Sequence, residues 1–236
     1  MKIRIISPIV STRPPNPAYL DRIRKFSGIS DSTELDTVRI EKGPTSIECR
    51  YDETFAIPHV LNKIKEASNV DAMVVNCFAD PGVKAGREIT NIPILGPGLS
   101  SMYVASSICN KFSILTILKS IVPELEEHVM EYGLMSKLAS IRAIDIPVLD
   151  LHSNEEKTIE NLVEQGRKAI DEDGAEALIL GCTGMTGMAE ELSKSLGVYV
   201  VDPLPTAVKL AETLASLKLS HSKITYPVPP KKQIFT

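Results

Sequence analysis

The chain has 236 residues, of which 43% are hydrophobic and 24% are charged, so it is long enough to bury a sizeable core. A net charge of -4, an aromatic content of 5% and the absence of tryptophan argue against a nucleic-acid binder, which needs basic patches and stacking side chains. Arg4 interrupts the N-terminal apolar stretch, and no apolar run reaches the roughly 18 residues of a membrane span, so we expect neither a signal peptide nor a membrane protein.

Short runs rich in β-branched residues alternate with longer helix-like segments along the chain. The predicted strands are residues 2–8, 36–41, 72–77, 92–95, 112–117, 141–146, 177–182 and 198–202. Several of these runs are almost continuously apolar, as in parallel strands that are covered on both faces. Strands that alternate with helices predict an α/β fold with parallel sheets and right-handed crossovers.

Three of the intervening segments carry clear helix signals. The first has Asn16 as its N-cap and Pro17 at the first helical position. The second, residues 56–67, places its apolar residues on one stripe. The third runs from a capping box formed by Ser153 and Glu156 to about residue 170. The proline-rich residues 225–235 cannot be helical and predict an extended arm, lying on the surface or on a partner subunit.

Two segments, residues 72–105 and 177–211, match each other in order and spacing. In both, a cysteine follows the first alanine by five positions, a proline follows the cysteine by 20 or 21 positions, and the last alanine follows that proline by eight. Similar strands also stand 75 and 71 residues before the two cysteines. Chance does not readily supply strand, cysteine, helix and proline turn in step, so we infer an internal duplication with two similar lobes.

The chain has four cysteines: Cys49, Cys77, Cys109 and Cys182. They include no Cys-x-x-Cys pair, which fits neither a disulfide framework nor a zinc knuckle, so we expect a cytoplasmic protein with reduced thiols. The four histidines lack ligand spacing, and we expect no metal site. His152 follows a predicted strand and either reaches a cleft or faces solvent.

Cys77 and Cys182 each end a predicted strand and precede a helix, which is where open parallel sheets bind ligands. We expect Asp80 to cap the helix after Cys77, with Pro81 at its first position. After Cys182, we expect Thr183 or Thr186 to cap the next helix and Gly197 to end it in a left-handed turn. Each sulfur would then lie near a positive helix end, which lowers the pKa of a thiol.

The groups around these cysteines suggest a binding site for an oxyanion. The backbone N–H groups of Phe78, Ala79, Thr183 and Gly184 are expected to be available for it. Ser7 and Thr116 end matching strands and are expected to line the cleft from the two lobes. Asp80 has three open roles: tuning the Cys77 thiol, binding substrate, or only capping its helix.

Two thiols that face each other across a cleft suit one kind of chemistry. One thiolate removes a proton next to a carbonyl, the N–H groups hold the resulting enolate, and the other thiol returns a proton to the opposite face. This arrangement predicts racemisation or epimerisation without a cofactor. Buried cysteine is also a common inert side chain, and we interpret Cys49 and Cys109 in that way because they lack the duplicated context.

At CFADPG (77–82) and LGCTGM (180–185) the sequence resembles the aspartate/glutamate/hydantoin racemase superfamily, most closely its hydantoin and allantoin racemase branch. Further segments fall in the family's order: IPILGPG (92–98), FSILTI (112–117), EYGL (131–134) and IPVLDLH (146–152). The resemblance covers the chain up to about residue 216. The paired cysteine motifs are the specific part of it.

The resemblance implies two Rossmann-like lobes with parallel four-stranded sheets, related by a pseudo-twofold axis, and an active site in the cleft between them. It implies catalysis by Cys77 and Cys182 with no metal, no pyridoxal phosphate and no other cofactor. It also implies that the C-terminal helix packs back on the first lobe, so that lobe 1 comprises residues 1–98 and 208–236 and lobe 2 comprises residues 99–207. We expect a homo-oligomer.

The sequence departs from the hydantoin branch where Ser7-Pro8-Ile9 replaces Asn-Pro-Asn and where Gly96 to Leu99 replaces a Gly-x-Gly-Glu turn. Both changes make the pocket less polar, so our leading hypothesis is a racemase of 5-substituted hydantoins or related cyclic ureides. The alternatives are an aspartate/glutamate-type racemase, for which Arg13 is the candidate carboxylate-binding residue, and a lyase or isomerase on the same frame. A non-catalytic ligand binder is a further alternative. In each case the expected partner is a small molecule, not a nucleic acid or a membrane.

Overall fold

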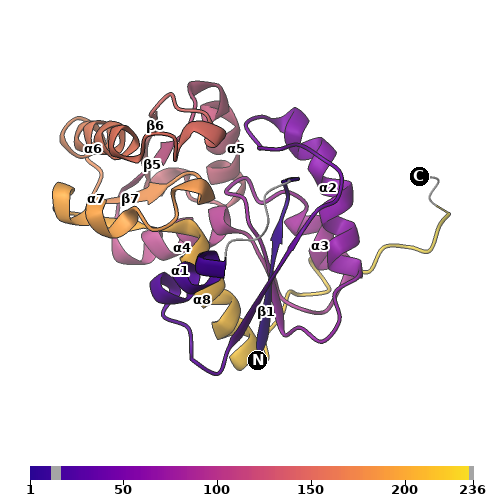
Figure 1. Ribbon diagram of the computed structural model, residues 1–236. Coiled ribbons are helices and arrows are strands. Elements are labelled where there is room, and N and C mark those ends of the chain that lie inside the picture. Colours follow the sequence, from indigo (N-terminus) through magenta and orange to yellow (C-terminus); the bar gives the residue numbers. More distant parts are fainter. Residues whose placement is uncertain (12–16, 234–236) are drawn as a thin grey trace.

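Eight parallel strands form two separate sheets, one in each lobe of the computed structural model, which describes residues 1–11 and 17–233 (Figure 1). The first sheet has the order β2-β1-β3-β4 and consists of β1 (Lys2–Ser7), β2 (Glu34–Arg39), β3 (Ala72–Val75) and β4 (Ile94–Leu95). The second has the order β6-β5-β7-β8 and consists of β5 (Phe112–Thr116), β6 (Leu138–Ala143), β7 (Ala177–Leu180) and β8 (Tyr199–Val201). The predicted α/β class with parallel four-stranded sheets is confirmed, and the identical strand order agrees with a duplication.

Helices make the crossovers that parallel strands require. They are α1 (Pro17–Ser27), α2 (Arg50–Lys65), α3 (Val83–Ile89), α4 (Pro97–Ile108), α5 (Val122–Glu131), α6 (Glu155–Asp171), α7 (Ala189–Leu196) and α8 (Pro203–Ser216). Single 3-10 turns occur at η1 (Lys119–Ile121), η2 (Met135–Lys137), η3 (Val148–Asp150) and η4 (Thr183–Met185).

Three of the four central strands are buried along their whole length, which explains their continuous apolar sequences. Every residue of β3, β5 and β7 is buried. In β1 the side chains alternate between two cores, because successive strand residues point to opposite faces. Ile5 packs in the core beneath α1 and α8, whereas Ile6 packs in the core beneath α2.

Helices α4 and α8 each follow a strand of one lobe but pack on the other lobe. Helix α4 follows β4 of the first sheet, yet Met102 and Ala105 on it are part of the hydrophobic core of the second lobe. Helix α8 follows β8 of the second sheet, yet Leu204 and Val208 on it pack in a core of the first lobe, beside β1 (Figure 1). The lobes are therefore tied together by an exchange of helices; the boundaries at residues 98 and 208 stay a prediction.

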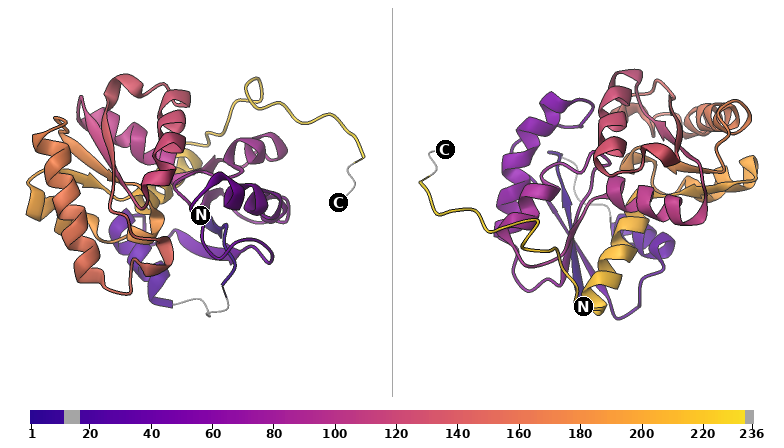
Figure 2. Two further views of the ribbon diagram at one scale, coloured as in Figure 1. Left: turned by 90° about the horizontal axis from the view of Figure 1, so that it is seen from above. Right: turned by 180° about the vertical axis from the view of Figure 1, so that it is seen from behind.

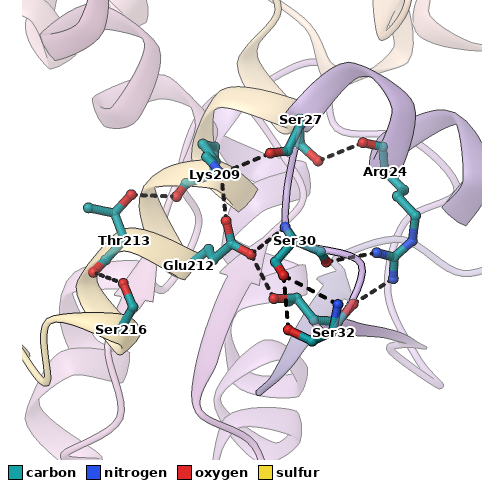
Figure 3. A network of polar contacts seen from close by, with 10 residues as sticks. Arg24, Ser27, Ser30, Ser32, Lys209, Glu212, Thr213 and Ser216 are labelled. Atoms are coloured by element: carbon teal, nitrogen blue, oxygen red, sulfur yellow. Dashed lines mark hydrogen bonds and ion pairs between the residues drawn. The ribbon is translucent and has the colours of Figure 1, made fainter.

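A polar network fastens α8 to the first lobe (Figure 3). The buried Glu212 carboxylate accepts hydrogen bonds from the Ser30 N–H at 2.8 Å and the Thr33 hydroxyl at 2.6 Å. Lys209 donates to Glu212 at 2.7 Å and to the Gly28 carbonyl at 2.8 Å. These contacts hold the helix against the loop that precedes β2.

Some helix starts differ from their predictions. Asn154, whose side chain accepts the Lys157 N–H at 3.0 Å, is the N-cap of α6, so the predicted capping box of Ser153 and Glu156 is wrong. Asparagine caps as well as serine does, and the sequence offers both side by side. Helix α2 begins at Arg50 and not near residue 56. Asn16, the predicted cap of α1, lies outside the described residues.

The segment after α8 first packs on the first lobe and then leaves it. Arg87 donates a hydrogen bond to the Tyr226 hydroxyl at 2.9 Å, and the Ile94 N–H donates to His221 at 2.9 Å. Residues 227–233 are exposed and run away from both lobes (Figure 2). None of the helices in the described parts of the chain combines the length and the apolar character needed to cross a bilayer.

Candidate active site

A cavity of about 690 Å³ lies where the carboxyl ends of β1 and β3 meet those of β5 and β7. Cys77 and Cys182 both line it. The other predicted site residues that line it are Ser7, Phe78, Ala79, Thr183 and Gly184. The volume is within the usual range of small-molecule sites, so the cavity has room for a small ring that carries a substituent.

Thr116 does not line the cavity, and our expectation for it is wrong. The residue is fully buried, and within the described parts of the chain its hydroxyl has no hydrogen-bond partner. Its neighbour Ile117 lines the cavity instead. The strand register confirms that Ser7 and Thr116 are equivalent positions, since Ile6 pairs with Val75 and Leu115 pairs with Leu180, so the two lobes differ in which residue at this strand end reaches the cavity.

The backbone follows the same path after each cysteine. The Asp80 N–H donates to the Cys77 carbonyl at 3.1 Å, and the Met185 N–H donates to the Cys182 carbonyl at 3.1 Å. In both turns the N–H two residues after the cysteine faces its sulfur. The Gly184 N–H lies 3.3 Å from Cys182 Sγ, and the Ala79 N–H makes the corresponding interaction with Cys77.

The two cysteine turns are close together across the cavity. The Thr183 hydroxyl donates to the Asn76 carbonyl at 3.5 Å, which brings the residue after one cysteine into contact with the residue before the other. The charge of Cys182 is also close enough to raise the pKa of Cys77. The sequence could not place the two sulfurs relative to each other, whereas the structure brings both into one site.

The expected lowering of the two thiol pKa values is wrong. Burial raises the pKa of Cys77 well above its ordinary value and raises that of Cys182 to about 11, although the facing N–H groups partly oppose this. The helix ends that were expected to favour the thiolates lie further along the chain. Helix α3 begins only at Val83 and α7 only at Ala189, so no α-helix starts at either sulfur.

The predicted helix caps next to the cysteines are also wrong, apart from Gly197. Gly82, with φ of 74°, is the N-cap residue of α3, and Asp80 reaches the start of α4 instead. Met188 is the N-cap residue of α7, so neither threonine caps it. Gly197 ends α7 with φ of 75°, as predicted.

A polar part of the cavity wall was missed from the sequence. The Asn76 side chain donates to the Tyr19 hydroxyl at 2.7 Å, and both residues line the cavity together with Arg22 and Arg39. Burial raises the pKa of Tyr19 to about 12, so this hydroxyl is neutral. Arg39 ends β2 and Asn76 follows β3, the two strands that flank β1, and the rule that selected the cysteines would have found both residues. Arg13 lies outside the described residues.

Much of the remaining lining is apolar. It includes Ile117, Ile121, Leu125 and Val148 from the second lobe, and Ile47 from the first. A ligand that fills the cavity therefore meets both hydrogen-bonding groups and hydrocarbon. Such a lining suits a ring with a polar edge and an apolar substituent.

The remaining candidates lie outside the cavity. His152 is exposed, as is Cys49. The Cys109 thiol donates to the Ala105 carbonyl at 3.2 Å, within its own helix end. Across residues 1–11 and 17–233, no three His, Cys, Asp or Glu side chains are grouped so as to hold a metal ion.

This fold and cavity define a two-lobed α/β protein in which each lobe contributes one cysteine to a shared site. A sequence model of the Asp/Glu/Hydantoin racemase family matches residues 18–211. A hydantoin racemase from Pseudomonas sp. (strain NS671) is 41% identical over 236 residues, covering 99% of this chain and 94% of that protein.

Solved structures agree with this match. The allantoin racemase from Klebsiella pneumoniae has a TM-score of 0.90 at 33% identity and covers 100% of this chain and 96% of its own. The allantoin racemase from Pseudomonas fluorescens has a TM-score of 0.92 at 29% identity and covers 100% of both chains. The chain belongs to the Asp/Glu/hydantoin racemase family, as its sequence motifs indicated.

Proposed function

We propose that this chain is an isomerase that interconverts the enantiomers of a 5-substituted hydantoin or a related cyclic ureide without a cofactor. The observation that carries the proposal is that Cys77 and Cys182, from equivalent strand ends of two lobes, line one cavity. The names of the similar proteins, hydantoin racemase and allantoin racemase, support the substrate class.

The reaction needs one thiolate and one thiol. The thiolate removes the proton from the ring carbon that bears the substituent, and the electron pair of that C–H bond moves into the adjacent carbonyl to form an enolate. The opposite thiol then protonates the same carbon from the other face and becomes the thiolate. The reverse reaction starts from this exchanged state, which is why two similar half-sites suit it.

The enolate oxygen requires hydrogen-bond donors. The Ala79 and Gly184 N–H groups face the sulfurs. In the described part of the chain, no acceptor takes the N–H of Phe78 or of Thr183. We infer that these two N–H groups hold the substrate's oxygen atoms, whereas Ala79 and Gly184 stabilise the thiolates.

The raised thiol pKa values have a catalytic consequence. A thiolate that is hard to form is also a stronger base, and the proton next to a ureide carbonyl is only weakly acidic. Burial thus makes the active form rarer but more reactive. We expect activity to increase with pH through the neutral range, because the fraction of enzyme with one thiolate increases.

The test uses one enantiomer of 5-benzylhydantoin in deuterated water. Optical rotation and the loss of the ring C–H signal should change together, and the Cys77→Ser and Cys182→Ser variants should each abolish racemisation. The Cys109→Ser variant is the matched control and should keep the parent rate. A Cys77 or Cys182 variant that racemises like the parent contradicts the two-thiol mechanism.

One observation favours a second candidate substrate. Arg22 and Arg39 line the cavity, and arginine binds carboxylates well. An aspartate/glutamate-type racemase therefore remains the alternative, and L-aspartate is the second substrate in the same assay. Turnover of aspartate but not of hydantoins would reverse the order of the two candidates. Exchange with neither class would favour a ligand binder.

We also infer a reducing, cytoplasmic setting and a homo-oligomer. Two thiols that must stay reduced suit the cytoplasm, and all four cysteines are free. Large apolar side chains, among them Tyr51 and Phe55 on α2, are exposed and support self-association. Light scattering after gel filtration tests the oligomer.

A further inference from the structure

Each cysteine turn is fastened by one aspartate, which is buried in the case of Asp80 and partly buried in the case of Asp202. The Asp80 carboxylate accepts hydrogen bonds from the Gly98 N–H at 2.9 Å and the Leu99 N–H at 2.8 Å, in the first turn of α4. It also accepts one from the Tyr132 hydroxyl at 2.9 Å. Asp80 is only 9% exposed and has a left-handed backbone with φ of 56°, which is uncommon for a residue with a side chain.

The contact between the Cys77 turn and α4 is closely packed. A Cβ atom on Gly96 would lie 2.1 Å from Asp80 Cγ, and one on Gly98 would lie 2.1 Å from the Phe78 carbonyl oxygen. Only glycine at these two positions lets the carboxylate reach the helix. Because α4 is packed in the core of the second lobe, Asp80 connects the cysteine turn of the first lobe to the body of the second.

Asp202 makes the reciprocal connection. It stands just before α8, which is packed in the first lobe, and its carboxylate accepts the Gly187 N–H at 2.5 Å from the turn that follows Cys182. Gly187 has φ of 94°, and a Cβ atom there would lie 2.3 Å from Arg22 Nε. Asp80 belongs to the Cys77 turn and bonds to the start of α4, whereas Asp202 precedes α8 and bonds to the turn that follows Cys182.

We propose that Asp80 and Asp202 are positioning residues, each holding one cysteine at the orientation and spacing that proton transfer across the cavity requires. The inference rests on the proposed function. In both cases the tie joins the turn after a cysteine to a helix that packs in the other lobe, so the two carboxylates together fix the sulfurs relative to each other.

A purely structural role does not explain why these groups are carboxylates. Burial raises the pKa of Asp80 and that of Asp202 to about 6, which means that the charged form is costly to bury at these positions. The Asp80 carboxylate accepts on both of its oxygens, Oδ1 from the Gly98 N–H and Oδ2 from the Leu99 N–H and the Tyr132 hydroxyl, whereas an asparagine of the same shape offers one acceptor oxygen. The cost is understandable where placement of the cysteine turn matters more than stability.

The first experiment needs no substrate. The rates at which iodoacetamide alkylates Cys77 and Cys182 are measured by peptide mass spectrometry in the parent, Asp80→Asn and Asp202→Asn. Asp80→Asn should change the Cys77 rate by about three- to tenfold and leave the Cys182 rate within about twofold. Asp202→Asn should do the opposite. Equal changes at both cysteines, or no change at either, would overturn the proposal, whatever the racemisation assay gives.

The second experiment uses both enantiomers of 5-benzylhydantoin in deuterated water. A misplaced cysteine should slow proton exchange from the enantiomer that it deprotonates by roughly ten- to a hundredfold, while the other enantiomer still exchanges with retention. The two variants should therefore affect opposite enantiomers. If both slow the same enantiomer, or slow both equally, the aspartates do not position separate cysteines. A parent that exchanges neither enantiomer contradicts the proposed function and leaves the alkylation result to decide the positioning.

Two further variants guard against general loss of folding. Tyr132→Phe removes one of the three bonds to Asp80 and should produce a smaller change at Cys77 alone. Glu212→Gln alters a buried carboxylate whose network lies within the first lobe, away from both cysteine turns (Figure 3). It should lower stability without changing the ratio of the two alkylation rates.

Discussion

Gly98, the second residue of α4, packs directly against the turn that carries Cys77. Replacing it with alanine adds one methyl group, which would lie 2.1 Å from the Phe78 carbonyl oxygen and 3.2 Å from Asp80 Oδ2. Nonbonded atoms of this kind are comfortable only at about 3.5 Å, so the helix and the turn must move apart by about 1.4 Å. The Asp80 carboxylate then loses its bonds to the Gly98 and Leu99 N–H groups.

The sign of the stability change decides between two arguments. Helix propensity alone predicts that Gly98→Ala stabilises the protein by about 1 kcal/mol. Overpacking together with weakened bonds to a charged group costs about 3 kcal/mol. The structure therefore predicts a net loss of about 2 kcal/mol, which lowers the thermal midpoint of a chain of this size by about 4–8 °C.

Urea and thermal denaturation measure this change, and racemisation is followed in parallel. Ser107→Ala is the matched control, because Ser107 is exposed on the same helix and, among the described residues, its hydroxyl bonds only to the Val104 carbonyl. It should alter stability by no more than about 0.5 kcal/mol. A Gly98→Ala protein as stable as the parent, with normal activity, would refute the close-packed contact between α4 and the Cys77 turn.

Three further predictions concern ionisation and the C-terminal segment. Burial raises the pKa of Cys182 to about 11. The rate at which Cys182 is alkylated in the unliganded protein should therefore increase about tenfold per pH unit from about pH 7 to 10. A plateau near pH 8.5 in the rates measured by mass spectrometry would contradict this prediction. Burial raises the pKa of Asp80 from 3.8 to about 6, so the folded state binds a proton at Asp80 more tightly than the unfolded state does. Protonation of Asp80 therefore stabilises the folded state below about pH 4, and this stabilisation is lost as the pH increases through 6. Relative to Asp80→Asn, the parent should lose about 3 kcal/mol of unfolding free energy over that range. The same pH dependence of the unfolding free energy in both proteins, measured by urea denaturation, would contradict this prediction. Truncation after Tyr226 should leave the urea midpoint unchanged because residues 227–233 are exposed. Tyr226→Ala removes the contact with Arg87 and should lower the free energy of unfolding by about 1–2 kcal/mol. Equal effects of the two changes would contradict this prediction and show that the exposed arm is anchored.

Much of the fold could be predicted because it is encoded locally. Parallel strands that are covered on both faces need continuous apolar runs, and such runs located the fully buried strands β3, β5 and β7. The edge strands β2 and β6 are only partly buried, and their β-branched residues located them. The repeated spacing around Cys77 and Cys182 predicted two similar lobes and placed both cysteines at strand ends. Since the carboxyl ends of parallel strands share one edge of a sheet, these positions were enough to expect the cysteines in a cleft.

The partners of individual side chains could not be predicted in the same way. Asp80 has the local signature of an N-cap for the next helix, with proline directly after it, but its carboxylate bonds to the start of α4, about twenty residues further on. Thr116 and Ile117 are neighbours at one strand end, and only the path of the chain decides which of them reaches the cavity.

The order of strands and helices along the chain, the two similar lobes and the choice of Cys77 and Cys182 as cavity residues follow from the amino-acid sequence, because each depends on residues that are near one another along the chain. The thiol pKa values, the arginines at the cavity and the aspartate ties were decided only by tertiary structure. They depend on burial and on contacts between segments far apart in the sequence, and no local pattern records which segments will meet.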